Sequence, residues 1–538
     1  MPVFVFPGSR LLVLAGVFFF MGVSLGFSET ITLEQAVKKT FNDNPYIQIE
    51  KETVSSAQGE YQTSLGEFDW LFFLGVSAEH TNRAVAGSVQ DAQRRQQAGQ
   101  NALIRIVNGL SLATLPLSSS SIAGETREEV VSLSTGVVKK LKSGVTLTSS
   151  AGVTDFKGNS TVDGLSQTDV RLKIVVPTLR GFGTEVTTAT SQAAASILEA
   201  TRLSSYHNIS DDIHRTIVAF YNCLAAQQSV DLVNESFKRA NVLLENVENM
   251  VAAGMLEPAF LNQAKAKLYN TQVDVKNGEI SLYETRQALG LAMGMDSDAL
   301  ITPPLSQGDF PPVFKAEAVN HLGPMVFIRT AKENRMDYRA TLESVNAENI
   351  LLKQAKDDKK PKLDLTFQLG YAGLSEESNR YWTSFYDNVK GPYGYAGINL
   401  ELPFENNYAK GRYRSRASSL TSAKLSADAA FNAISSEVLT ALEKIKMLVT
   451  QYELAAKSAE RYKAAVSFEK KKYDAGESTL NALIDIEDRY MDAKLTVIET
   501  IRRYAVALAR LKFVTGTLLE KDNDELRFHL NRMTGKLG

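Results

Sequence analysis

The chain has 538 residues, of which 44% are hydrophobic, and this is ample apolar material for folded domains. Lys and Arg number 59 against 61 Asp and Glu, so the net charge is −2 and no basic block is present that would follow nucleic-acid phosphates. This charge balance means that a nucleic-acid partner is not expected. The single Cys223 excludes an intrachain disulfide. The five histidines are scattered and lack metal-ligand spacing, so a bound metal is not expected either.

The N-terminus carries an apolar run from Leu11 to Phe27, with the small residues Gly26 and Ser28 at its end. This pattern is typical of a cleaved export signal and predicts a signal peptide over residues 1–28. A retained membrane helix is the alternative, because Arg10 is the only charged residue before the run. No later segment has the roughly 18 apolar residues of a membrane helix, so any later crossing would have to be made by β-strands.

Two parts of the sequence recur further along the chain. The segment from Asn42 aligns without gaps on that from Asn334, an offset of 292 (334 − 42), and the segment from Ala253 aligns on that from Ala475, an offset of 222 (475 − 253). The sequence therefore predicts a tandem duplication. Its expected parts are a first repeat at 29–293, a linker at 294–323, a second repeat at 324–517 and a C-terminal tail at 518–538, with an extra segment at 82–168 in the first repeat.

Each repeat contains alternating apolar and polar residues, as in "KLDLTFQLGY", where Leu365 and Phe367 alternate with Thr366 and Gln368. Such alternation predicts strands with one apolar face, although a soluble half-buried strand gives the same pattern. Two strands are expected in each repeat, at about 69–80, 170–177, 362–372 and 395–403. The extra segment contains a further hairpin turning at Lys142 to Gly144, and its place in the fold is left open.

Aromatic residues gather between the two strands of the second repeat. They suit a membrane–water interface, and a packed aromatic loop is the alternative. The residues are Tyr381, Trp382, Phe385, Tyr386, Tyr393 and Tyr395.

Long helical segments follow the strands in both repeats. Neither Gly nor Pro occurs from Thr184 to Ala253 or from Arg412 to Ala475, and an unbroken helix of this size spans roughly 100 Å. Apolar residues spaced three and four apart suit coiled-coil packing, and Gly254 and Gly476 then predict the tips of helical hairpins over 184–293 and 404–517. An exported coiled-coil periplasmic adaptor or a structural rod is the alternative, but a rod does not need paired strands at equivalent places in two repeats.

The alternating strands bear on assembly. Two strands per repeat would give four per chain, and about eight are needed to close even a small barrel. Several chains would therefore have to contribute strands to one barrel.

The sequence resembles the TolC-type outer-membrane factors, the exit ducts of bacterial efflux pumps and type I secretion systems. The resemblance covers nearly the whole mature chain and rests on "NDNPYI" in the early helix, "PTLRGFG" from Pro177, "YDAG" from Tyr473 and the two-repeat order of elements. It implies a mainly α fold in which duplicated hairpins form a periplasmic coiled-coil tunnel and the strands join a trimeric outer-membrane β-barrel of twelve strands.

The resemblance also implies functional residues near the hairpin tips. A gate would include Tyr473 and Asp485, whereas Ala482 stands where the family has a second acid. Asp485 could equally be a solvated helix residue, and turn chemistry alone would explain the glycines of the tips. Periplasmic adaptors would dock on Ala253, Gly254, Met255, Ala475, Gly476 and Glu477.

The function expected from this resemblance is passive transport of small molecules or proteins across the periplasm and outer membrane. The duct would be a homotrimer that contacts outer-membrane lipid and works with an adaptor and an inner-membrane pump. No nucleophile, phosphate-binding loop or zinc-binding pattern indicates an enzyme, and no cofactor is implied.

Overall fold

We describe the protein from a computed structural model, which covers residues 30–109, 115–117, 124–158, 164–321, 323–377, 379–387, 389–522 and 525–528. The expected signal peptide, residues 1–28, lies outside the described residues. The chain divides into two compact units, of which unit 1 takes residues 1–49, 208–334 and 434–538 and unit 2 takes residues 50–207 and 335–433. Each unit combines segments of both sequence repeats, so the units do not coincide with the repeats, and the repeat boundaries remain a proposal.

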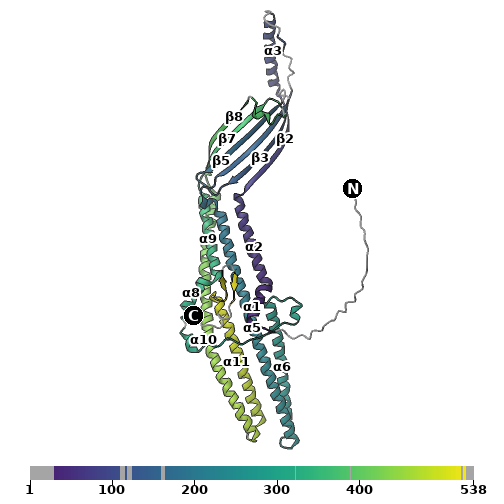
Figure 1. Ribbon diagram of the computed structural model, residues 1–538. Coiled ribbons are helices and arrows are strands. Elements are labelled where there is room, and N and C mark those ends of the chain that lie inside the picture. The colour runs from purple at the N-terminus through teal and green to yellow at the C-terminus, as the bar shows by residue number, and fades with distance from the viewer. Residues whose placement is uncertain are drawn as a thin grey trace, which may run out of the picture. The chain divides into compact units, whose positions relative to one another are not determined.

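Unit 2 is built around a six-stranded sheet ordered β2-β3-β4-β5-β7-β8, and every neighbouring pair is antiparallel (Figure 1). Among the described residues, β2 and β8 are the edge strands, with a strand neighbour on one side only. The strands are β2 (Trp70–Ala84), β3 (Glu125–Lys140), β4 (Thr146–Gly158), β5 (Leu165–Pro177), β7 (Lys362–Ser375) and β8 (Val389–Glu401).

This sheet includes the hairpin whose place in the fold the sequence left open. The extra segment at 82–168 supplies β3 and β4, which pair between β2 and β5. The turn expected at Lys142 to Gly144 joins them, and Gly144 has a φ of 96°, a conformation that side chains with a Cβ rarely adopt. The chain therefore contributes six strands to one sheet, because the two strands of the hairpin join the four expected in the two repeats.

Helices lie before or between several strands of unit 2. The helix α3 (Gly87–Gly109) lies between β2 and β3 and was not expected from the sequence. The helices α2 (Pro45–Leu65) and α9 (Met336–Asp357) precede β2 and β7 at equivalent places in the two repeats. The short elements are η1 (Gly66–Phe68), α4 (Thr184–Thr187) and η3 (Thr383–Phe385).

Two very long helices run through both units. The helix α5 (Ala189–Ala252) has 64 residues and α10 (Asn407–Asp474) has 68, so each is about 100 Å long. Each turns at its C-terminal end into a second helix, α6 (Ala259–Ala292) or α11 (Leu480–Val514), within unit 1 (Figure 1). The long helical hairpins predicted from the Gly- and Pro-free runs are confirmed.

The four hairpin helices end in the same way. At the end of α5, Met255 N donates to Met250 O at 2.9 Å and Gly254 N donates to Val251 O at 3.0 Å. This pair of bonds is the Schellman motif, which needs a positive φ at the residue that is most often glycine. Equivalent bonds occur at the other three ends, and the glycines have φ of 72° (Gly254), 79° (Gly294), 77° (Gly476) and 68° (Gly516).

The remaining elements of unit 1 are short. A capping box starts α1 (Leu33–Asp43), because Thr32 Oγ1 accepts from Gln35 N and the Gln35 side chain accepts from Thr32 N. The strands β1 (Thr30–Ile31) and β6 (Leu305–Ser306) pair in parallel, with Thr30 opposite Leu305 and Ile31 opposite Ser306. The others are η2 (Ala299–Ile301), α7 (Ala316–Asn320), α8 (Pro324–Asn334), β9 (Glu520–Asp522) and β10 (Glu525–Arg527).

The core of unit 1 lies among α1, α5, α6, α10 and α11. Its centre is apolar, and a few hydroxyl groups satisfy one another within it, such as Thr40 Oγ1 and Thr216 Oγ1 at 3.0 Å. The largest fully buried side chains of this core are Ile213, Ile217, Phe220, Leu289, Met293, Leu442, Ile445, Leu448 and Tyr504.

Candidate functional site

The two faces of the six-stranded sheet differ in chemistry. Directly opposed residues of neighbouring strands lie on the same face, so the register assigns every strand residue to a face. Val76 opposes Leu133, and Leu133 opposes Val153. We call their side the apolar face. Its exposed large side chains are Trp70, Phe72, Leu74, Val76, Val131, Leu133, Val170, Leu172, Phe367, Leu369, Tyr371, Ile398 and Leu400.

The opposite side, which we call the polar face, carries hydroxyl, amide and charged groups in its middle part. Arg171 Nε lies 3.2 Å from Asp169 Oδ2 and donates to Ser150 Oγ at 3.1 Å. The middle of this face also includes Ser77, Ser132, Ser134, Thr148, Lys173, Thr366, Gln368 and Asn399. The sheet therefore has one polar surface and one exposed apolar surface.

Aromatic rings interrupt the polar face, and several of them cover a glycine. Phe73 opposes Gly136, and a Cβ on Gly136 would lie 2.7 Å from the Phe73 ring. Tyr393 covers Gly370 in the same way, with a Cβ position 2.4 Å from the Tyr393 ring. These ring-over-glycine pairs explain why the alternation in β2 is imperfect in the sequence.

Exposed aromatic side chains occur at both ends of the sheet. At the end joined to the long helices, Lys139 Nζ lies 5.3 Å from the Trp70 ring, and Phe404 is 99% exposed. At the other end, Trp382 and Tyr386 in the β7–β8 connection are each 81% exposed. Of the aromatic residues expected at an interface, Tyr393 and Tyr395 lie on the polar face instead, within β8.

The two hairpin tips have exposed turns. Gly254 and Gly476 adopt positive φ, and no atom lies within 4 Å of a Cβ built on either. Met255 is 71% exposed at the first tip. Ala253 and Ala475 donate backbone hydrogen bonds to Asn249 O and Lys471 O, while Glu477 N completes the second Schellman motif. The tips therefore present small or flexible groups on a rigid turn.

Tyr473 lies at the C-terminal end of α10. Its ring packs against a buried cluster that joins the two hairpins, formed by Leu243, Val247, Ala264, Leu480 and Leu483. Burial, and secondarily the neighbouring Asp474 charge, raise the pKa of Tyr473. Tyr473 thus contributes to packing between the hairpins of one chain.

Asp485 is exposed on α11 and is paired within its own helix. Its Oδ2 accepts from Arg489 Nε at 2.9 Å, in an i,i+4 pair that is exposed on both sides. The hydrogen bond from Arg489 to Asp485 is the main cause that raises the pKa of that guanidinium. The carboxylate expected at a gate is therefore accompanied by a cation one turn away.

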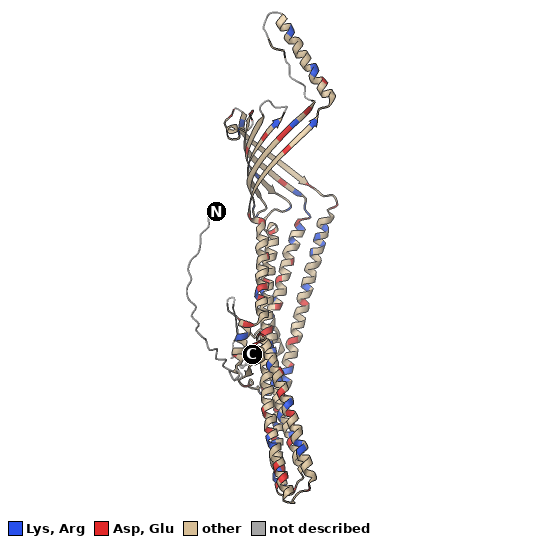
Figure 2. Ribbon diagram, turned by 90° about the vertical axis from the view of Figure 1, so that its right-hand side faces the viewer, with Lys and Arg blue, Asp and Glu red and all other residues tan. Residues whose placement is uncertain are grey.

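A charged cluster near the tip was missed by the sequence reasoning. Lys267 of α6 pairs with Asp488 of α11, and Glu487 lies beside them. Burial raises the pKa of Glu487, while the charges of Arg239 and Lys267 oppose that rise. These residues come from separate helices, so no local spacing in the sequence could have grouped them. Figure 2 shows how acidic and basic residues intersperse along the hairpin helices.

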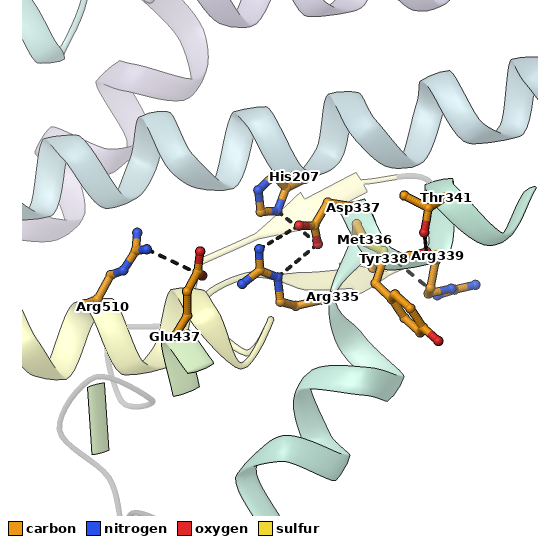
Figure 3. Close-up of polar contacts among 9 residues, drawn as sticks. All are labelled: His207, Arg335, Met336, Asp337, Tyr338, Arg339, Thr341, Glu437 and Arg510. Carbon is orange, nitrogen blue, oxygen red and sulfur yellow. Dashed lines mark hydrogen bonds and ion pairs between the residues drawn. The ribbon is translucent and has the colours of Figure 1, made fainter. Parts of the chain in front are cut away.

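Another polar network lies in unit 2 at the start of α9 (Figure 3). The buried Arg335 donates from Nε and Nη2 to the carboxylate of Asp337, at 3.0 and 2.6 Å. His207 Nδ1 lies 3.6 Å from the same carboxylate. Burial acts to raise the pKa of Asp337, but the Arg335 hydrogen bond and the His207 charge together hold it below its usual value. This network joins α5 to the start of α9.

Within the described ranges, no three His, Cys, Asp or Glu side chains form a group that could hold a metal ion. Over the same residues, none of the helices combines the length and the apolar character needed to span a bilayer.

Comparison with known proteins identifies structural relatives. No family model and no curated protein sequence matches the chain. Solved structures do match: the CmeC outer membrane channel of Campylobacter jejuni has a TM-score of 0.60 at 15% identity, over 90% of this chain and 85% of that one. The outer membrane protein VceC of Vibrio cholerae has a TM-score of 0.59 at 14% identity, over 90% and 96%. The open-state MtrE outer membrane channel of Neisseria gonorrhoeae has 0.57 at 15%, over 90% and 88%. These likenesses show the fold.

Proposed function

We propose that this chain, which has the fold of the TolC-type outer-membrane factors, is a passive exit duct in the outer membrane with a tunnel that extends into the periplasm. The observation that carries the proposal is the six-stranded sheet with one exposed apolar face, joined to helices about 100 Å long. A large exposed apolar surface indicates contact with lipid or another protein.

The sheet has the dimensions and chemistry of a membrane wall. Its strands have 13 to 16 residues, against the roughly 9 to 11 needed to cross a bilayer. The apolar face would meet lipid and the polar face would line water, while exposed rings such as Trp70 and Trp382 would lie at the two interfaces. Thr366 and Gln368 would then face the lumen.

Assembly as a homotrimer would complete this wall. The edge strands β2 and β8 leave backbone groups that another strand can pair with. Three copies of the six-stranded sheet would give eighteen strands, in place of the twelve implied by the resemblance. Barrels of about 16 to 18 strands enclose an aqueous channel.

The hairpins supply a second surface for assembly. Large apolar side chains remain exposed on one side of α6, at helical spacings of three, four, seven and eight residues. They are Tyr269, Val273, Ile280, Tyr283 and Leu291. Burial of this stripe against hairpins of neighbouring copies would close the periplasmic tunnel.

Partners would act at the hairpin tips. A periplasmic adaptor would dock on the exposed turns at Gly254 and Gly476, and an inner-membrane pump would supply the energy of transport. The open turns and the exposed Met255 support this part of the proposal. The duct would serve a tripartite efflux pump or a type I secretion system, pass small molecules or proteins, and perform no chemistry of its own.

The gate would lie at the same end. Separation of the hairpins would have to break the packing of Tyr473 and the Lys267–Asp488 pair. Asp485 would stand near the threefold axis, where three carboxylates attract cations, but each is partly neutralised by its own Arg489.

The experiment that tests the proposed function combines location with conductance. Protein expressed with its own N-terminus should appear in the outer-membrane fraction and require detergent for extraction. Purified protein should then produce stepwise conductance in planar bilayers. Recovery in the soluble periplasmic fraction, without any conductance, would overturn the duct and favour a coiled-coil adaptor or rod.

A further inference from the structure

The connection between β7 and β8 does not project freely from the sheet. Its described residues, 376–377 and 379–387, which we call the strap, lie against the apolar face. Asn379 N donates to Asp155 Oδ1 at 3.0 Å, and Thr168 Oγ1 donates to Tyr381 O at 2.9 Å. Both Asp155 and Thr168 belong to the apolar face by register.

The polar groups under the strap are buried and mutually satisfied. Ser384 Oγ donates to Thr168 Oγ1 at 2.9 Å, and Ser166 Oγ donates to Asp155 Oδ1 at 2.7 Å. All four side chains are nearly inaccessible to water. Gly373 makes the close approach possible, because a Cβ there would lie 2.1 Å from Ser384 O. The strap is therefore a fixed part of the fold.

A cavity of ≈ 480 Å³ lies between the strap and strands β2 to β5. Its floor is formed by Val76, Val131, Leu133 and Val153, and Tyr381 and Trp382 contribute from the strap. The size is in the usual range for a small-ligand site. Because the polar network beside it is satisfied internally, the cavity offers almost entirely apolar contacts.

We propose that this cavity, the strap groove, binds one acyl chain of a membrane lipid. The proposal rests on the proposed function, since the groove opens on the face of the sheet that would meet lipid. An apolar cavity there is filled most readily by the hydrocarbon that surrounds it. Lys157 lies two residues beyond Asp155 on the same face of β4, with its Nζ 3.8 Å from the Asp155 carboxylate. The Lys157 side chain is 49% exposed, and its ammonium group suits the anionic headgroup of the same lipid.

The groove would hold lipid in the leaflet remote from α9. β7 begins at Lys362 after α9 and reaches the strap at its far end, so the strap marks the outer limit of the apolar face. A chain held under Trp382 would contact both a ring and the strand floor, whereas a chain elsewhere on the sheet would contact one surface only. The groove should therefore retain lipid that the rest of the sheet exchanges freely.

The chain is suited to a fluorescence test because Trp70 and Trp382 are its two tryptophans. Trp70→Phe leaves Trp382 as the reporter of the groove, and Trp382→Phe leaves Trp70 as the reporter of the opposite end of the apolar face. Each variant is reconstituted into phosphatidylcholine vesicles with increasing fractions of phosphatidylglycerol brominated on its acyl chains, because Lys157 should favour this anionic lipid over the zwitterionic host lipid. Bromine quenches tryptophan on contact, so quenching reports lipid next to each ring.

We expect half-maximal quenching of Trp382 at about a tenfold lower fraction of brominated lipid than that of Trp70. Val153→Phe, which fills the groove, should remove this difference. Val170→Phe is the matched control, because Val170 is exposed on the same face but does not line the groove. Fluorescence of the Trp70 reporter in both backgrounds checks that the protein is inserted.

The possible outcomes distinguish failure of the proposed lipid groove from failure of the proposed duct. Quenching of Trp382 that only follows the bulk lipid fraction, with no effect of Val153→Phe, would overturn the groove while leaving the duct intact. The same is true if Val170→Phe acts as strongly as Val153→Phe. Absence of quenching at both tryptophans would mean that the sheet does not meet a bilayer, and would overturn the proposed function together with the groove.

Discussion

At the scale of single residues, glycines set where the helices turn. Gly254, Gly294, Gly476 and Gly516 occupy equivalent places in the two repeats and all have positive φ. Their surroundings differ, because a Cβ on Gly254 would meet open space while one on Gly294 would lie 2.4 Å from the Asn44 Cα. A side chain larger than hydrogen therefore has room at Gly254 but not at Gly294, which lies against the end of α1.

This contrast gives a first prediction. Gly254→Ala should destabilise the protein by about 1 to 2 kcal/mol, the cost of a left-handed residue with a Cβ. Gly294→Ala should cost more, since the methyl group also collides with the backbone at Asn44. Thermal unfolding of the two purified variants checks this order. Equal midpoints would show that the collision at Gly294 relaxes without cost.

A second prediction concerns pH and His214. Burial, then the Arg510 charge, lower the pKa of His214 from 6.5 to about 4, and its ring stacks on Phe513 at 5.1 Å. The unfolded chain therefore binds a proton between about pH 6.5 and 4 that the folded chain does not, so stability falls as the pH falls through this window. The loss should reach about 3 kcal/mol below pH 4.

The measurement is the unfolding midpoint from pH 7 to pH 4. His214→Gln should flatten its decline, because the group that takes up the proton on unfolding is gone. His321→Gln is the control, since His321 is exposed, and it should keep the slope of the unmodified protein. A slope unchanged by His214→Gln would place the pH dependence in other groups.

A third prediction concerns the proposed gate. Arg489→Ala should increase cation selectivity in planar bilayers by freeing the Asp485 carboxylate, and Asp485→Ala should decrease selectivity and block by multivalent cations. Tyr473→Ala should raise conductance by loosening the hairpin contact. If conductance, selectivity and block are unchanged in all three variants, the closure lies elsewhere in the tunnel.

At the scale of elements, the sequence was most informative where the signal is local. Runs without Gly or Pro predicted α5 and α10, and glycine after each run predicted the tips, because helix formation depends on neighbouring residues. Alternation likewise predicted the strand that became β7 (Lys362–Ser375). The place of the further hairpin in the sheet was left open by the sequence, however, and α3 (Gly87–Gly109) was not foreseen.

These misses have a physical cause. Alternation in the extra segment showed a hairpin, but strand partners are chosen by contacts far apart in sequence, and a hairpin carries no mark of the sheet it joins. Only the register that places β4 against β5 makes the insertion part of the wall. For the same reason the Lys267–Asp488 pair could not be predicted, since its members are brought together by two separate hairpins.

A fourth prediction tests the two faces of the sheet. Leu365→Arg should cost roughly 2 to 4 kcal/mol if that position lies near the middle of the bilayer, because it puts a charge on the apolar face. Thr366→Arg on the polar face should be tolerated. The yield of detergent-extracted, folded protein in the outer-membrane fraction compares the two. Greater damage from Thr366→Arg would reverse the assignment of lipid and lumen.

At the scale of the whole molecule, the sheet formed by the described residues has two edge strands and an exposed apolar face, and both features support the proposed assembly of several copies. The homotrimer proposed here would place eighteen strands in one barrel, three times the six of each chain. A wall of this size encloses a water-filled pore without occluding side chains. It is wider than the twelve-stranded barrel that the sequence resemblance implied, and the difference comes from β3 and β4.

The mass of the protein extracted from the outer membrane in mild detergent tests this assembly most directly. Native mass spectrometry after removal of the detergent counts the chains in each particle. We expect particles of three chains, because the edge strands β2 and β8 must pair between copies to close the wall. A stable, folded single chain as the dominant species would contradict it.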